Sequence, residues 1–399
     1  MRNRFILLFL TQLVILFCSA QENSLKKQVI LSTRDLYQQG LIEKPYLLAE
    51  MEQQLGKDTL AWEQSVFCKA ATLVANDLLG GFMVNPWFTF DAVSIQVHQK
   101  KLNEIRGSVL SMRRPVQLLS LISTLTSPRT AAEASLFTEY KRRLVIAANH
   151  LTRANNDTLL FVKQAYMLYK WIGHLDLPRY FIVDIAKNEL RYVSNRRDSL
   201  ALKVVVGKPA TPTPYFAAWI NQLVLYPYWY VPFSIATQEF LPKLKKDATW
   251  LDNQNMQVMD KGGRILNADT IQWKKYSSFN FPFTLRQSTG CDNALGILKF
   301  EFSTPYGVYI HDTNNKAAFL RKNRFISHGC IRVEEPFLLS ELVLKEKLDT
   351  GYLQTCLMEQ KPTYQKITDS VPVFSIYTIA HAQQNGTVTY LKDHYNLFK

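Results

Sequence analysis

The spacing of hydrophobic residues divides the chain into two parts. From about residue 25 to 175, apolar side chains recur at the three- and four-residue intervals of amphipathic helices. Thr130-Ala131-Ala132-Glu133 is a capping-box pattern and predicts the start of a long helix. Residues 155–157 interrupt this pattern, and a second helix is expected at about 159–171. Earlier helices are expected at about 44–56 and 60–79.

The pattern changes to strand-like alternation at Leu177-Pro178. Residues 180–184 and 190–193 flank Lys187-Asn188, which is typical of a hairpin. Near the C-terminus, Asn385-Gly386 predicts a second tight hairpin. Further strands are expected at 202–206, 223–231, 296–302, 308–312, 371–382 and 387–391, and helical patches at about 237–252 and 336–348. These patterns predict an α+β protein in which helices precede a β-rich domain.

One connection in the β-rich part is unusually long. Residues 233–295 lie between two expected strands, and long loops within compact domains are usually lids or binding elements. We therefore predict a helical scaffold region over 21–176 and a β-rich domain over 177–399, which carries a lid segment at about 233–295.

The first twenty residues have the pattern of a signal peptide. Arg2 and Arg4 supply the positive end, an apolar run covers residues 5–17, and Ser19-Ala20 offers small residues for cleavage. The run is shorter than the roughly 20 apolar residues that a membrane span needs, and no later stretch is apolar enough. We expect export to the periplasm or cell envelope, with no transmembrane segment in the mature chain.

Composition and charge narrow the class of partner. The 399 residues are 47% hydrophobic and 20% charged, which is typical of a globular protein with a substantial core. The formal net charge of +14 favours polyanionic partners in general. Because export separates the chain from nucleic acid, an anionic wall polymer or envelope surface is the expected partner.

Cysteine is used sparingly. After the signal peptide the chain keeps Cys68, Cys291, Cys330 and Cys356, without CxxC or zinc-binding spacing, so no metal site is expected. An exported chain of this size does not need a disulfide framework, and the sequence leaves one or two bridges open. A thiol kept in an oxidising compartment is usually there for its reactivity, so each cysteine is a candidate nucleophile.

Cys330 has the neighbours that suit catalysis. A thiol becomes a strong nucleophile beside a base, and both His311 and His328 lie within about twenty positions of Cys330. Gly329 permits a sharp turn that can expose the sulfur and direct backbone N–H groups at an oxyanion. We interpret the other five histidines as surface or packing residues. Spacing alone leaves a nucleophile as one reading and a metal site or buried cysteine as the other.

An ordered set of motifs extends from about Tyr180 to the C-terminus. The blocks are Val206 to Pro209, Thr211 to Pro214, Pro227 to Pro232, Ile235-Ala236 with Glu239, Leu241 to Lys243, Leu285 to Gln287, Asn293 to Gly296, Lys299-Phe300, Tyr309 to Thr313 and Ser327 to Arg332. A lone His-Gly-Cys would be weak, but blocks in this order are specific. This set resembles the YkuD-type L,D-transpeptidases, in particular the long-chain branch with a lid inserted in the catalytic domain.

The resemblance implies a division of labour between the two histidines. Cys330 corresponds to the nucleophile of the family and His311 to its general base. His328, although closer to Cys330 in the sequence, has a structural or orienting part. The base is therefore expected from the more distant strand end.

The remaining residues of these blocks carry two readings each. Ser327 and Gly329 orient the site or its oxyanion, and a turn-capping role is equally open for Ser327. Arg332 binds a carboxylate of the substrate or forms a structural salt bridge. Tyr309 lines the pocket or packs against its neighbours.

The reaction implied by the resemblance is a peptidoglycan cross-link. Tetrapeptide stems serve as donor and acceptor, a thioester joins the donor to Cys330, and a 3→3 link results without a metal or organic cofactor. The resemblance also implies acylation by carbapenems, which are beta-lactam inhibitors. Two alternatives stay open: an L,D-carboxypeptidase or endopeptidase with the same thioester, and a non-catalytic wall-binding scaffold.

The chain departs from the family in two places. Thr289-Gly290-Cys291 stands where the family often has Pro-Gly-Pro, so the local shape of the lid and the pairing of Cys291 are open. The chain also shows no peptidoglycan-binding module with a Phe-Gln helix motif. We therefore expect residues 21–176 to act as a scaffold only.

Overall fold

A computed structural model describes most of the chain. The expected signal peptide, 1–20, and Cys356 lie outside the described residues. The described residues are 23–39, 41–42, 44–55, 66–80, 89–112, 115–150, 152–353, 355 and 360–398.

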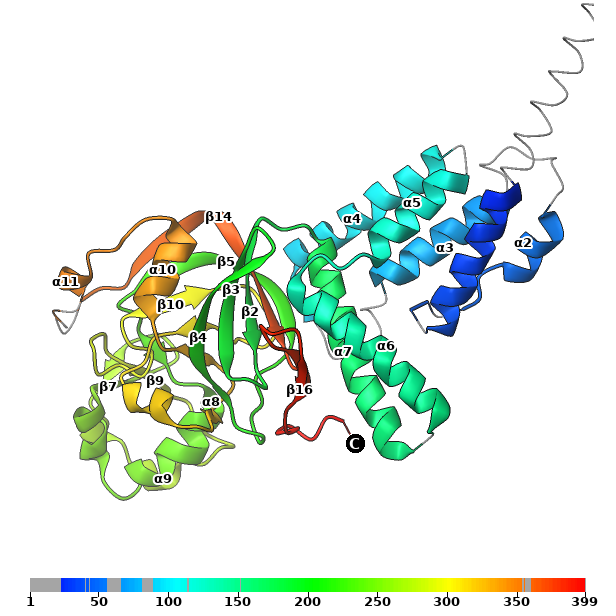
Figure 1. Cartoon of the computed structure of the whole chain (residues 1–399). Helices are drawn as coiled ribbons and strands as arrows, with labels where there is room; N and C mark the ends of the chain where they lie inside the picture. The colour runs from blue at the N-terminus through cyan, green and yellow to red at the C-terminus, as the bar shows by residue number, and fades with distance from the viewer. Residues whose placement is uncertain are drawn as a thin grey trace, which may run out of the picture.

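The N-terminal part is helical, as predicted, and forms an arm beside the β-rich part (Figure 1). Residues 23–38 form its first described helix. The others are α2 (Leu48–Gln54), α3 (Val66–Gly80), α4 (Ala92–Ser111), α5 (Pro115–Thr126), α6 (Ala131–Asn149) and α7 (Arg153–His174). In the described part of the chain, no helix is both long and apolar enough to cross a membrane.

The boundary between α6 and α7 corrects one prediction. The Thr130 cap is confirmed, because its hydroxyl accepts a hydrogen bond from the backbone N–H of Glu133 at 3.1 Å. However, α6 ends at Asn149 and α7 begins at Arg153, so Asn155 to Asp157 lie inside α7. Thr152 caps α7 by accepting from the Asn155 N–H at 3.2 Å. Polar residues in a first helical turn can therefore continue a helix that they would interrupt elsewhere.

The β-rich part contains a sheet that closes on itself. In spatial order its strands run β5, β10, β11, β13, β4, β3, β2 and β14, and β14 pairs again with β5. A short strand, β1 (Thr89–Phe90), adds to β5, and β12 adds to β4. The bounds are β2 (Arg179–Asp184), β3 (Glu189–Ser194), β4 (Arg197–Gly207), β5 (Phe216–Leu225), β10 (Leu298–Glu301), β11 (Ile310–His311), β12 (Phe325–Ser327), β13 (Ile331–Val333) and β14 (Thr363–Ile376).

Two apolar clusters lie on opposite faces of this closed sheet. The interior is filled by one face of each strand, including Val204, Phe300 and Ile331. The outer face of β2 and β14 packs against the helical arm, where the Trp171 and Phe374 rings meet edge to face at 5.5 Å. The chain therefore has an α+β fold in which helices and sheet share one core.

The segment expected as a lid forms a small unit of its own. Its sheet has the order β6 (Trp229–Tyr230), β9 (Thr284–Gln287), β7 (Met256–Met259) and β8 (Ile265–Leu266). This unit lies below the closed sheet in Figure 1. Its helices are α8 (Phe233–Ile235), η3 (Ala236–Phe240), α9 (Leu241–Leu244), η4 (Ala248–Trp250), η5 (Asp252–Gln254), η6 (Ala268–Thr270) and η7 (Trp273–Lys275).

The strand predicted at 223–231 is two strands. Tyr226 has a positive φ of 51°, which bends the chain out of the closed sheet between β5 and β6. The unit beyond this bend has a separate apolar cluster that includes Leu251, Val258 and Leu285. Aromatic and aliphatic residues of the connection thus supply a core that a plain loop would lack.

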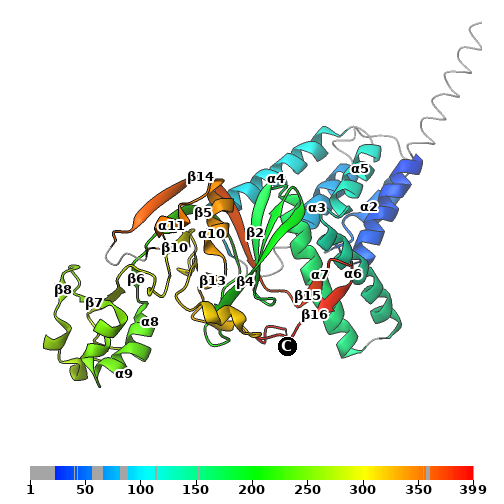
Figure 2. The same ribbon diagram turned by 60° about the vertical axis from the view of Figure 1, so that its left-hand side comes forward.

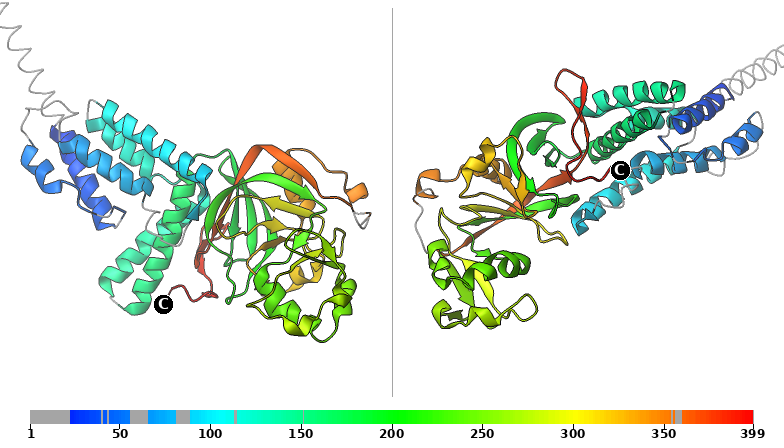
Figure 3. Two further views of the ribbon diagram at one scale, coloured as in Figure 1. Left: turned by 180° about the vertical axis from the view of Figure 1, so that it is seen from behind. Right: turned by 90° about the horizontal axis from the view of Figure 1, so that it is seen from below.

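The C-terminal part completes the fold. Figures 2 and 3 show its last hairpin between the helical arm and the sheet. Asn385-Gly386 lies in the turn of this hairpin, as predicted, and Gly386 has a φ of 84°. The remaining elements are η8 (Lys316–Leu320), α10 (Pro336–Leu344), α11 (Thr350–Leu353), β15 (Ala380–Ala382) and β16 (Val388–Tyr390).

Candidate functional site

The predicted nucleophile and base lie on neighbouring strands. β11 and β13 are parallel, and His311 is in register with Arg332. Side chains two positions apart leave the same face of a strand. Cys330 and Tyr309 therefore share the outer face of the sheet with His311 and Arg332. The fold thus gathers these four residues, which come from two separate sequence blocks.

Hydrogen bonds fix the turn of residues 327–330, which ends at Cys330. Gly329 has a φ of 113°, which a side chain would strain. The Ser327 hydroxyl donates to the Cys330 carbonyl at 2.7 Å and accepts the Gly329 N–H at 3.2 Å. The Thr213 hydroxyl donates to the Gly329 carbonyl at 2.8 Å. Ser327 therefore caps the turn, and the Gly329 N–H is already engaged.

The Cys330 thiol lies in a partly buried setting. Burial raises its pKa, while the backbone and hydroxyl of Tyr309 and the charges of Lys299 and Arg332 lower it. Burial is the largest of these effects, so the pKa stays above its ordinary value. The resting group at neutral pH is a thiol, which needs a base for attack.

His311 is positioned as a neutral base. Its ring is 4% exposed, and its Nδ1 lies 2.5 Å from the Asp312 carbonyl oxygen. Because a carbonyl only accepts, Nδ1 carries the proton, and the Leu295 backbone also hydrogen-bonds to the ring. Burial, and then the charges of Arg332 and Lys299, lower the pKa of His311 to about 3. No hydrogen bond joins His311 to Cys330 among the described contacts, which is common before substrate binds.

Arg332 is a half-buried cation beside the thiol. Its Nε has no hydrogen-bond partner, and no acidic side chain of the described residues lies within ion-pair distance of it. Burial lowers its pKa, and the Cys330 thiol opposes this effect. A guanidinium in this state suits a planar carboxylate. Of the two readings from sequence, the structure contains no salt bridge for Arg332.

His328 points to the lid segment. Its side chain is exposed, and its Nε2 lies 2.6 Å from Oε1 of Glu239 in η3. His328 therefore joins the turn of residues 327–330 to the unit formed by residues 229–287. Glu239 was recognised from sequence only as part of a motif, and the sequence carries no signal for this pairing.

Lys299 is a further residue to which sequence reasoning gave no role. It is in register with His311, and its Nζ lies 4.3 Å from the centre of the Tyr309 ring. Its amine also forms an ion pair of 2.5 Å with Glu301. The polar positions of an alternating strand could have placed Lys299 on the outer face, but not opposite His311.

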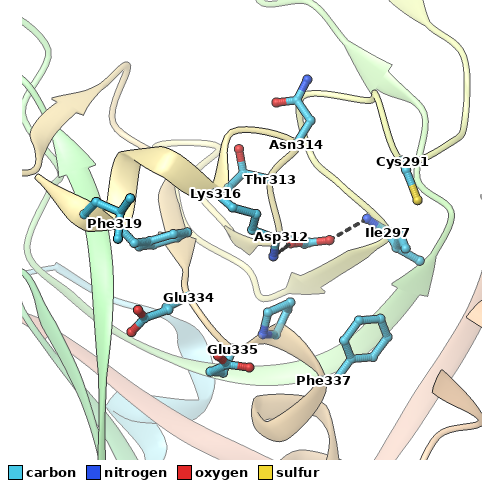
Figure 4. A pocket seen from close by; sticks show the side chains of 12 residues that line it. Cys291, Ile297, Asp312, Thr313, Asn314, Lys316, Phe319, Glu334, Glu335 and Phe337 are labelled. Carbon is cyan, nitrogen blue, oxygen red and sulfur yellow. Dashed lines mark hydrogen bonds and ion pairs between the residues drawn. The ribbon is translucent and has the colours of Figure 1, made fainter. Parts of the chain in front are cut away.

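A cavity of about 600 Å³ adjoins the site at the ends of β11 and β13. Glu334 and Phe319 lie on one side of it, with Cys291 and Phe337 across from them (Figure 4). Cys291 is disulfide-bonded. The Asp312 carboxylate on the cavity wall accepts from the Ile297 N–H at 2.9 Å. The cavity wall thus stiffens the backbone that orients His311, although neither Cys330 nor His311 lines the cavity.

The described residues offer no place for a metal. They contain no group of three or more His, Cys, Asp or Glu side chains with metal-binding geometry. The chemistry available at the site is that of a thiol, an imidazole and a guanidinium.

Comparisons with known proteins relate the β-rich part to one enzyme family. Residues 178–347 match the YkuD family, described as the L,D-transpeptidase catalytic domain. A Haemophilus influenzae protein that bears the name "Putative L,D-transpeptidase" is 32% identical over 224 residues. That match covers 55% of this chain and 45% of the relative, so the chain spans less than half of the relative's length.

Similar solved structures include two bacterial L,D-transpeptidases. One is the catalytic domain of the E. faecium enzyme acylated by ertapenem, with 14% identity, 50% of this chain and 97% of that chain covered, and a TM-score of 0.24. The other is the Mycobacterium smegmatis enzyme, with 13% identity, 50% and 58% covered, and a TM-score of 0.22. The sequence match is therefore confined to residues 178–347, which are similar to the YkuD-type L,D-transpeptidase catalytic domain.

Proposed function

We propose that this protein is an exported peptidoglycan L,D-transpeptidase that forms 3→3 cross-links through a Cys330 thioester. The observation that carries the proposal is the grouping of a partly exposed thiol, a neutral imidazole and an unpaired guanidinium on one sheet face. The family match at residues 178–347 supplies the substrate class.

In the first half-reaction, Cys330 attacks the carbonyl carbon of the third residue in a donor tetrapeptide. Nε2 of His311 takes the thiol proton as the carbon–sulfur bond forms. The tetrahedral intermediate then collapses, the bond to the terminal D-alanine breaks, and His311 returns the proton to the leaving amine. A thioester with Cys330 remains.

In the second half-reaction, the side-chain amine of an acceptor stem attacks the thioester carbon. His311 takes a proton from this amine, the carbon–sulfur bond breaks, and the proton returns to the sulfur of Cys330. One base thus serves both halves, and no cofactor is required.

The surrounding residues position the substrate in this proposal. Arg332 holds a carboxylate of the stem, because its Nε lacks a protein partner. Tyr309 lies beside Cys330 and supports the thiolate. Ser327, Gly329 and His328 hold the turn that orients Cys330.

The lid segment decides the competition between transfer and hydrolysis. Water attack on the thioester would make the protein an L,D-carboxypeptidase or endopeptidase. The unit of residues 229–287 is tied to the catalytic turn by the His328–Glu239 contact, so it is placed to limit water at the thioester. Cleavage of residues 1–20 delivers the enzyme to the periplasm or cell envelope.

Mass spectrometry of the intact protein with purified disaccharide-tetrapeptide tests the proposal. We expect an acyl adduct on the wild type, dimeric muropeptides as product, and an adduct with a carbapenem. Cys330→Ala abolishes both adducts and His311→Gln slows them, while His150→Gln, at an exposed histidine of the helical arm, leaves them unchanged.

Three results would contradict the proposed function. Tripeptide without dimer would assign the hydrolytic alternative. Dimers from Cys330→Ala would refute the nucleophile. A wild type that forms no adduct with either reagent would favour the non-catalytic wall-binding scaffold.

A further inference from the structure

Asp312, the residue that follows the base, is held by its other polar groups as well as by its carbonyl. It is buried, with 4% of its surface exposed, and its backbone N–H donates to the Leu298 carbonyl at 2.8 Å. Its carboxylate accepts from the Ile297 N–H at 2.9 Å and forms an ion pair of 2.5 Å with Nζ of Lys316 (Figure 4). The carbonyl that faces Nδ1 of His311 therefore belongs to a residue that is fixed at its remaining polar atoms.

Gly296 makes room for the carboxylate of Asp312. Gly296 has a φ of 61°, in the left-handed region that favours glycine. A Cβ at this position would lie 2.2 Å from Oδ2 of Asp312 and 2.4 Å from its Cγ, which is closer than non-bonded atoms can approach. The carboxylate thus lies directly on the backbone of residues 296–297. We call this backbone, together with Lys316, the Asp312 seat.

The turn that carries the seat also contacts the lid unit and the base. Asn293, which begins this turn, is fully buried. Its side-chain amide donates to the carbonyls of Pro227 and Ser288 at 3.2 and 2.7 Å, and these two residues lie just outside the first and last strands of the lid unit. The Leu295 backbone hydrogen-bonds to the His311 ring. The turn is therefore fixed between the lid unit and the base, and the seat is fixed with it.

The position of the Asp312 carbonyl decides which nitrogen of the base is free to accept a proton. A neutral imidazole carries one proton, and a hydrogen bond from one ring nitrogen leaves the other nitrogen as the acceptor. A carbonyl held at Nδ1 leaves Nε2 as the acceptor, which is the form that proton transfer from Cys330 needs. If the carbonyl turned away, the proton could move to Nε2, and this acceptor would be lost. Lys316 also offsets the charge of the carboxylate, which would otherwise favour the imidazolium form.

We propose that Asp312 is a positioning residue, whose carboxylate holds its own carbonyl against His311 and so keeps the proton of the ring on Nδ1. The carboxylate acts through the base and does not contact the reacting atoms. This inference rests on the proposed function, in which His311 is the base, and adds the group that sets its tautomer. It also gives the motif of residues 293–296 a role, because this motif ends at the glycine of the seat.

The test reads the tautomer and the rate of acylation in the same variants. Nitrogen NMR of protein labelled in its histidine rings distinguishes Nδ1–H from Nε2–H, and His311→Gln assigns the signal. Asp312→Ala should lose the Nδ1 proton and slow acylation by a carbapenem about a hundredfold, which is within the range that a general base contributes. Asp312→Asn keeps an oxygen for the Ile297 N–H, so it should retain the tautomer and a rate within about fivefold of the wild type. Asp157→Ala breaks an ion pair of the same i,i+4 spacing on the helical arm and should change neither reading.

Other outcomes overturn the positioning role. A wild type with the ring proton on Nε2 would refute it without recourse to any variant, so the test holds even if Asp312→Ala does not fold. A slower Asp312→Ala that keeps the Nδ1 proton would mean that Asp312 only supports the fold, and a rate equal to the wild type would mean that its carboxylate is not needed. Loss of the Nδ1 proton in Asp312→Asn would also contradict the seat. Failure of the proposed function is seen separately, as a wild type with the proton on Nδ1 that neither a carbapenem nor the disaccharide-tetrapeptide acylates.

Discussion

At the residue scale, burial has the largest effect on the pKa values of Cys330 and His311. Burial is the largest cause of both shifts, since it keeps the Cys330 thiol protonated and His311 neutral. Lys299 and Arg332 act in opposite senses on the two groups, because a nearby cation favours a thiolate and disfavours an imidazolium. In the proposed reaction, attack by Cys330 therefore requires proton transfer within the complex, not a preformed ion pair.

Tyr309→Phe tests the part of the tyrosine hydroxyl. The hydroxyl lowers the pKa of Cys330, so its loss should raise that pKa by about one unit, since a hydrogen bond to a charged group contributes about 1.5–3 kcal/mol. The thiolate forms above the pKa, so the rise of the rate with pH should move to higher pH. The measurement is the second-order rate of acylation by a carbapenem between about pH 6 and 10.

The control for this variant is Tyr306→Phe, on the exposed turn between β10 and β11. Its profile should overlay the wild type. An unshifted midpoint in Tyr309→Phe would show that the hydroxyl does not support the thiolate.

Sequence motifs selected the candidate reacting residues but not their environment. The motif order selected Cys330 and His311, and the structure places His311 on β11 and Cys330 directly before the neighbouring strand β13. The pairing of His328 with Glu239 and the register of Lys299 with His311 arise from contacts between distant segments. No local pattern encodes such contacts, because strand register is set by the whole sheet.

At the element scale, the turn of residues 327–330 depends on a second loop, residues 207–213. The Thr213 hydroxyl accepts the Gly207 N–H at 2.9 Å and donates to the Gly329 carbonyl at 2.8 Å. Gly207, at the end of β4, packs directly on the backbone of residues 211–213. The two family blocks, distant in sequence, are thus parts of one interlocked turn.

Gly207→Ala should disrupt this interlock. A Cβ at position 207 would overlap the Thr211 carbonyl oxygen and lie 2.7 Å from the Thr213 backbone nitrogen. Because both are backbone atoms, we expect the free energy of unfolding to fall by about 2–3 kcal/mol, and carbapenem acylation to slow as Gly329 shifts. Urea denaturation followed by circular dichroism measures the first effect.

Gly107→Ala is the matched control. Nothing lies within 4 Å of its added Cβ in the middle of α4, so the change should stabilise the protein by about 0.5–1 kcal/mol. Equal stability of the two variants would contradict the interlock.

At the scale of the whole molecule, the helical arm and the sheet are not independent bodies. One apolar cluster contains Tyr166 and Trp171 of α7 together with Ile182 and Phe374 of the sheet. Sequence patterns distinguished the helical part from the β-rich part. They did not reveal this shared core, because an amphipathic pattern shows which face of α7 or β14 is buried but not which element it packs against.

Trp171→Ala tests whether the two parts unfold together. The indole is 2% exposed and contacts Phe374 across the boundary, so we expect a loss of about 3–5 kcal/mol. Helical circular dichroism and the capacity for carbapenem acylation should be lost at the same urea concentration. Leu160→Ala, at an exposed position of α7, should change stability by less than about 0.5 kcal/mol. Acylation that survives unfolding of the helices would refute the shared core.

The small unit between β6 and β9 begins and ends on strands that are direct hydrogen-bonded partners, with Trp229 opposite Gln287 and Tyr230 opposite Arg286. An excursion whose two ends are already neighbours places little demand on the sheet from which it leaves. Its length can therefore change over evolution while its two ends stay paired. The same arrangement offers protein engineers an insertion point, because a foreign domain joined at the exposed turn of residues 261–264 would leave the contact between Glu239 and His328 in place.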